Sequence, residues 1–124
     1  MSWSFHAETG SQASDAMNNI NSWINEHKSG FCSKFAASDM KGKDARAVVF
    51  YSNEMIDVPS NQPGPDTKWA RYTQKTDTNY DLLYSEAANA LSGLSEEQQF
   101  YSSVMFTNAS GHDALIEIIY PVSI

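Results

Sequence analysis

The chain has 124 residues, of which 41% are hydrophobic and 19% are charged, and its formal net charge is −7. This is enough apolar sequence for one core and too little length for two ordinary domains, so we expect a single domain over residues 1–124. The one cysteine, Cys32, excludes an internal disulfide framework, and the acidic balance argues against a nucleic-acid partner.

The N-terminal stretch "MSWSFH" does not have the basic segment and apolar run of a signal peptide. No run of about 18 apolar residues is present that would cross a bilayer. We therefore expect a soluble protein without a membrane partner, and the lone cysteine favours a reducing, cytoplasmic setting.

The first half of the chain predicts a strand, a helix and a second strand. Apolar and polar residues alternate over residues 2–8, as in a half-buried strand. Apolar residues then follow helical spacing from Ala13 to His27, and the Ser29-Gly30 pair is a typical helix end. Residues 31–44 are ambiguous, with Phe31 and Phe35 as expected core anchors. The run "ARAVVFYS" predicts a strand over residues 45–52, because it is rich in β-branched and aromatic side chains.

The middle of the chain predicts a loop, a strand and a long helix. Three prolines in "PSNQPGPDT" favour an irregular segment. "KWARYTQ" can alternate as a strand, and we expect its Trp69 to pack in the core. A continuous apolar stripe from Tyr80 to Leu94 predicts a helix that ends at Gly93. Its expected cap is one of the residues Asp77, Thr78 and Asn79.

The last quarter predicts a short helical turn and a C-terminal hairpin. Residues 95–98 match a capping box. Residues 100–107 alternate as a strand, Asn108–Gly111 are typical of a turn, and residues 114–122 are apolar at nearly every position. A strand that is apolar on both sides must lie centrally in a sheet, or be covered by a helix or another subunit.

These elements predict an α+β fold with the order β-α-β-(β)-α-β-β. We expect a single-domain, two-layer sandwich in which two main helices pack on one face of a mainly antiparallel sheet of four or five strands.

The charges divide unevenly along the chain. All eight Lys and Arg residues precede residue 76, and the acids beyond it are Asp77, Asp81, Glu86, Glu96, Glu97, Asp113 and Glu117. A carboxylate near a helix N-terminus is stabilised by about 0.3–1 kcal/mol, which explains the position of several of these acids. It does not explain why no cation accompanies them.

This asymmetry favours a noncatalytic protein-binding module, of inhibitor, immunity or phage or bacterial accessory type, that presents an acidic surface to a basic protein partner. The expected partner-binding residues are Asp81, Leu82, Glu86, Glu96 and Glu97. The simpler interpretation of the same acids is a solvated surface that keeps the protein soluble.

The alternative is a small enzyme or small-ligand-binding domain whose pocket is built from dispersed residues. Trp69, Arg71 and Tyr72 are secondary ligand candidates, because neighbouring aromatic and basic groups stack on ligands and pair with anions. Further candidates for such a pocket are Cys32, His6 and His27. No catalytic or metal-binding spacing is present, so we assign no catalytic residue, no metal ligand and no cofactor. A homodimer formed through the C-terminal strand is compatible with either function.

Overall fold

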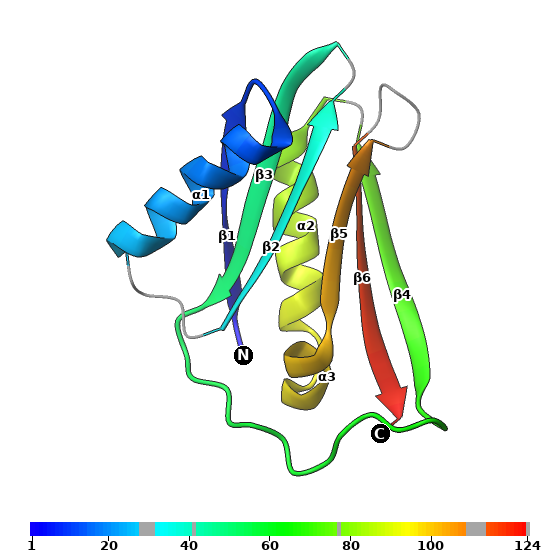
Figure 1. The fold of residues 1–124 in the computed structure, drawn as a ribbon. Helices are drawn as coiled ribbons and strands as arrows, with labels where there is room; N and C mark the ends of the chain where they lie inside the picture. Colours follow the sequence, from blue (N-terminus) through cyan, green and yellow to red (C-terminus); the bar gives the residue numbers. More distant parts are fainter. Residues whose placement is uncertain (28–31, 41, 77, 109–113, 124) are drawn as a thin grey trace.

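The computed structural model describes residues 1–27, 32–40, 42–76, 78–108 and 114–123. The elements in chain order are β1 (Trp3–Gly10), α1 (Ala13–His27), β2 (Cys32–Met40), β3 (Lys43–Ser52), β4 (Lys68–Thr76), α2 (Tyr80–Ser92), α3 (Glu96–Tyr101), β5 (Ser103–Asn108) and β6 (Ala114–Ser123). The predicted α+β class is confirmed, with two three-stranded antiparallel sheets and three helices (Figure 1).

The two sheets are built in the same way. Sheet A has the strand order β1-β3-β2, and sheet B has the order β4-β6-β5. In each sheet the last strand along the chain lies in the middle and is antiparallel to both neighbours. Strands β2 and β5 lie side by side, so the two sheets meet along a seam (Figure 1).

This arrangement places α1 and α2 on opposite faces. Each helix connects two parallel strands, and such crossovers are right-handed in nearly all proteins. One crossover runs from β1 toward the seam, and the other runs from β4 toward the seam from the opposite edge (Figure 1). Because the two run in opposite directions across the sheet, the same handedness puts their helices on opposite faces.

Strand β3 shows both faces of this packing. Ala47 and Val49 pack with Ile20 of α1 in a small core. Val48 and Phe50, which alternate with them, belong to the main core beneath α2. The predicted two-layer packing is present where α2 covers both sheets. The expectation that both main helices lie on one face is wrong, because the opposed crossovers put α1 on the opposite face of sheet A.

The ends of α2 and α3 agree with their sequence. Asn79 is the N-cap of α2, and its side-chain oxygen accepts a hydrogen bond from the Leu82 amide at 3.1 Å. Gly93 follows α2 as expected, although in a right-handed conformation. The predicted capping box is present at Ser95 and Gln98. No helix in the described part of the chain combines the length and the apolarity needed to cross a bilayer.

Several expectations need correction. The ambiguous segment forms β2, so the structure has six strands where four or five were expected. Phe35 was expected in the core, but it is 46% exposed, because it lies on the α1 side of β2, and α1 packs mainly over β1 and β3. Trp69 is 48% exposed, because its side of β4 is turned away from α2. Phe100 belongs to α3, which leaves β5 to begin at Ser103.

Four expectations fall on residues that the structure does not describe. These are Phe31 as a core anchor, Asp77 as a cap, the helix end at Ser29-Gly30, and the centre of the turn before β6.

The packing of α1 is tested by Ile20→Ala. Ile20 is fully buried against sheet A, so we expect the free energy of unfolding to fall by about 2–5 kcal/mol. Urea titration followed by circular dichroism measures the change. The control is Asn21→Ala on the exposed side of α1, for which a change within about 0.5 kcal/mol is expected. Equal stability of the two variants would contradict the packing of α1 on sheet A.

Candidate functional site

The outward side of α2 carries a short stripe of polar and acidic side chains around one apolar residue. This α2 stripe consists of Asp81, Leu82, Ser85, Glu86 and Asn89. It lies opposite the buried residues Leu83, Tyr84, Ala87, Ala88 and Leu91. Leu82 is 50% exposed, with Asp81 directly before it in the sequence and Glu86 four residues after it, about one helical turn away. The structure therefore brings three of the five expected partner-binding residues together.

The other two expected residues lie beyond the end of α2. Glu96 and Glu97 occupy the first turn of α3. Glu96 is exposed, whereas Glu97 is half-buried and lines a shallow depression of about 210 Å³ with the end of β6, residues 121–123. They extend the acidic surface onto a second helix and are not part of the α2 stripe.

The acids of this surface have no basic partner among the residues that the structure describes. Ion pairs within 4.0 Å there are His6 with Glu8, at 2.9 Å, and Arg71 with Glu117, at 3.2 Å. Glu117 is thus neutralised by a cation from the earlier part of the chain. Within the described ranges, no cation pairs with the carboxylates of the α2 stripe or of α3.

Arg46 approaches α2 from beneath. Its guanidinium lies 3.7 Å from the ring centroid of Tyr80, in a cation–π contact. Tyr84 lies next to it, and burial raises the pKa of the Tyr84 hydroxyl to about 12, although the nearby Arg46 partly opposes the rise. The Arg46 guanidinium is therefore held against the buried side of α2.

The secondary ligand candidates are divided between the two faces of β4. Tyr72 points toward α2 and lines a cavity of about 110 Å³ with Ala90, Leu94, Ile118 and Tyr120. Burial raises the pKa of Tyr72, and the negative charge of Glu86 raises it further. Trp69 and Arg71 lie on the opposite face, so the three side chains do not form one site.

We call this opposite face the outer face of sheet B. It consists of Trp69, Arg71, Thr73 and Lys75 from β4, Met105 from β5, and Leu115, Glu117 and Ile119 from β6. The alternate residues of β5 and β6, such as Phe106 and Ile116, are buried in the main core beneath α2. The outer face thus combines apolar side chains with two cations and one acid.

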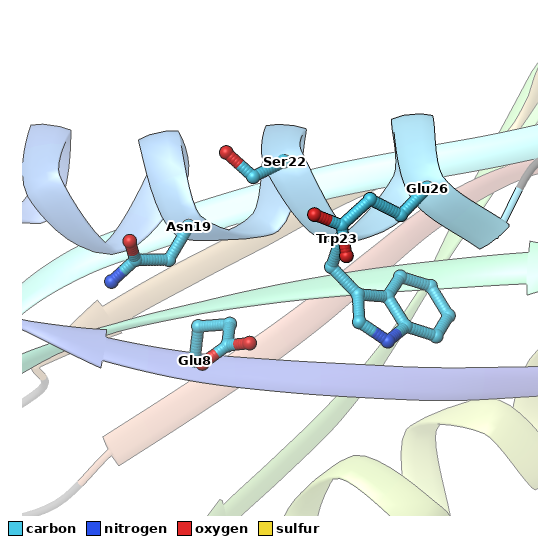
Figure 2. A pocket seen from close by; sticks show the side chains of 5 residues that line it. All are labelled: Glu8, Asn19, Ser22, Trp23 and Glu26. Carbon is cyan, nitrogen blue, oxygen red and sulfur yellow. The ribbon is translucent and has the colours of Figure 1, made fainter.

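A third feature is an open depression between β1 and α1, of about 400 Å³ (Figure 2). Glu8 lines it from β1, and Asn19, Ser22, Trp23 and Glu26 line it from α1. Its two carboxylates, one amide and one hydroxyl offer acceptors to a bound cation.

Beside this depression, Trp23 lies between two imidazole rings. The ring centroids of His6 and His27 are 4.0 and 4.2 Å from that of Trp23. Nε2 of His6 lies 2.9 Å from Glu8 Oε1, and Nδ1 of His27 donates to the backbone carbonyl of Trp23 at 2.8 Å. Sequence reasoning had named both histidines without placing them together. No spacing in the sequence indicates the stack, because it depends on the packing of α1 on β1.

The structure does not bring Cys32 to these histidines. Cys32 begins β2 and packs against the main core, on the α2 side of sheet A. Among the described residues, no group of three or more His, Cys, Asp or Glu side chains is arranged to hold a metal ion.

No protein-family model, curated protein or solved structure matches this chain. Its function therefore has to be argued from its own geometry.

The contact of the α2 stripe with β4 is tested through Tyr72. Because the charge of Glu86 raises the pKa of Tyr72, we expect Glu86→Gln to lower that pKa. An NMR titration of the tyrosine ring carbons, assigned with Tyr72→Phe, measures it. Glu97→Gln is the control and should leave Tyr72 unchanged. An unaltered Tyr72 pKa in Glu86→Gln would show that the two side chains are not neighbours in solution.

Proposed function

We propose that this chain is a noncatalytic protein-binding module whose acidic surface, made by the α2 stripe with Glu96 and Glu97 of α3, recognises a basic protein partner. The observation that carries the proposal is the α2 stripe itself. Its two exposed carboxylates flank a half-exposed leucine, with no Lys or Arg within ion-pair distance among the described residues. Inhibitor, immunity and accessory roles all suit such a surface, and a lone cysteine suits the cytoplasm.

The physical properties of α2 support this role. The helix is capped by Asn79 and packs against both sheets through its buried side, so its outward side chains stand on a rigid element. A rigid surface loses little conformational entropy on binding. The carboxylates speed the encounter with a basic protein, and Leu82 provides apolar contact once water has been displaced.

Charge reversal tests the proposal. We expect Asp81, Glu86, Glu96 and Glu97, all changed to Lys, to abolish salt-sensitive capture of a basic protein from the source lysate. The control reverses four exposed acids elsewhere, Glu26, Asp44, Asp57 and Asp66, and alters the net charge equally. It should keep the capture. Circular dichroism checks that both variants fold. Capture of the same protein by the surface variant and the wild type would refute the acidic surface as the site.

A second candidate function is supported by the depression between β1 and α1. Two carboxylates beside a histidine–tryptophan–histidine stack form a pocket from residues dispersed in the sequence, as the small-ligand alternative requires. Its chemistry suits an organic cation, such as an amine or a guanidinium compound.

Thermal denaturation with spermidine or argininamide tests this second function. A ligand at one hundred times its dissociation constant stabilises the native state by about 2.7 kcal/mol, so we expect a higher melting temperature. The variant Glu8→Gln/Glu26→Gln should lose that increase, and sodium chloride at equal ionic strength is the control. An equal increase in both proteins would point to nonspecific screening.

The homodimer expected through the C-terminal strand is constrained by the sheet order. Strand β6 lies between β4 and β5, and both of its backbone edges are hydrogen-bonded. A dimer built on β6 therefore has to use the face of this strand.

A further inference from the structure

The outer face of sheet B is open where the equivalent face of sheet A is covered. Helix α1 packs on β1, β3 and β2, and α2 lies on the other side of sheet B. Trp69 and Met105 on the outer face are each 48% exposed, and Leu115 and Ile119 between them are half-buried. Apolar surface that is gathered on one face in this way is typical of an interaction site.

The outer face also has a charge opposite to that of the α2 stripe. The Arg71 side chain is 66% exposed even though it contacts Glu117, whose side chain is only 17% exposed. Lys75 is exposed further along the same side of β4. Arg71 thus keeps most of its donors available to a second carboxylate, since a guanidinium has five.

We propose that the outer face of sheet B binds the α2 stripe of a second copy of this chain, so that copies associate head to tail. The proposal rests on the proposed function, because it uses the same acidic stripe, and it adds the positively charged outer face of a second copy as a further binding partner of that stripe. Arg71 and Lys75 on the outer face of one copy would pair with Asp81 and Glu86 of the next copy. Leu82 of the second copy would contact the apolar side chains around Met105.

The two surfaces are also compatible in length. From Trp69 to Lys75 the outer face extends about 20 Å along β4, at roughly 3.3 Å per residue. The α2 stripe, from Asp81 to Asn89, extends about 12 Å at 1.5 Å per residue, so it fits within the length of the outer face. A helix laid on this face would cover sheet B in the way that α1 covers sheet A.

The association has to be head to tail, because the two surfaces point in different directions. The outer face of sheet B is turned away from α2, which lies on the inner side of the same sheet. A two-fold dimer uses the same patch on both copies, whereas this contact uses two different patches. Such contacts form rings when the rotation closes and open chains when it does not.

The test uses two variants that each disable one surface. Asp81→Asn/Glu86→Lys disables the α2 stripe, and Arg71→Gln/Lys75→Glu disables the outer face by an equal and opposite change in charge. Glutamine at position 71 can still donate to Glu117, so the sheet is spared. The control variant Glu54→Lys/Asp57→Asn changes exposed acids of a loop. Melting temperatures verify that every variant is folded.

Sedimentation velocity gives the mass of each sample from about 10 µM to about 1 mM, a range that detects weak association. We expect the wild type and the control variant to form species larger than a monomer. Each disabled variant alone should be monomeric, and their equimolar mixture should form a 1:1 pair that grows no further. Raising the salt from about 0.05 M to about 0.5 M should weaken wild-type association at least tenfold, because screening shortens the reach of the charges.

Three results would overturn the inference. They are a wild type that is monomeric throughout, assembly of either variant alone, and the absence of a pair in the mixture. If the charge changes unfold a variant, Leu82→Ser replaces the variant that disables the α2 stripe, and Met105→Ser replaces the variant that disables the outer face. The same outcome of mixing is then required. A monomeric wild type that still loses its basic partner on charge reversal would reject self-association and leave the proposed function standing.

Discussion

The fold depends on the burial of β3 on both of its faces. Successive side chains of a strand point to opposite sides, so Val48 and Phe50 join the core beneath α2 while Ala47 and Val49 join the core beneath α1. Both faces of β3 are buried only if a helix packs on each of them. The two right-handed crossovers place one helix on each face. Sheet B has the same order of strands, but its middle strand β6 is covered by a helix on one face alone. The uncovered face is thus a consequence of the topology.

The sequence predicted those elements whose apolar pattern is regular. Period two found β1, and a β-branched run found β3, while helical spacing found α1 and α2. Strand β2 was missed because "CSKFAASDM" mixes small, charged and aromatic residues, with no pattern that separates a core side from a solvent side. Phe35 and Trp69 were expected in the core because of their size, yet each lies on a side that α1 and α2 leave at least partly uncovered. Which side a helix covers is set by connections over tens of residues, which local patterns do not contain.

The candidate surfaces were predictable from the sequence only where they follow from local patterns within one element. The α2 stripe follows from helical periodicity once the apolar side is known, and the absence of cations after Lys75 is visible in the sequence. The stack of Trp23 between His6 and His27 needs β1 and α1 to meet, and no spacing in the sequence encodes it. The pairing of Arg71 with Glu117 could not be predicted from the sequence either, because it depends on the register between β4 and β6.

The segregation of charge along the chain becomes a segregation between surfaces only through this topology. The last acid of the chain that the structure describes, Glu117, sits on the outer face and is matched by Arg71, so it does not add to the acidic surface. Arg46 is held under α2 by Tyr80 and does not reach the stripe on the outward side. Had either cation reached the stripe, each carboxylate there would lose an ion pair before it could form one with a partner, and binding would gain little. The cations of β4 and the acids of α2 are instead kept apart by the thickness of sheet B, which leaves both available to another molecule.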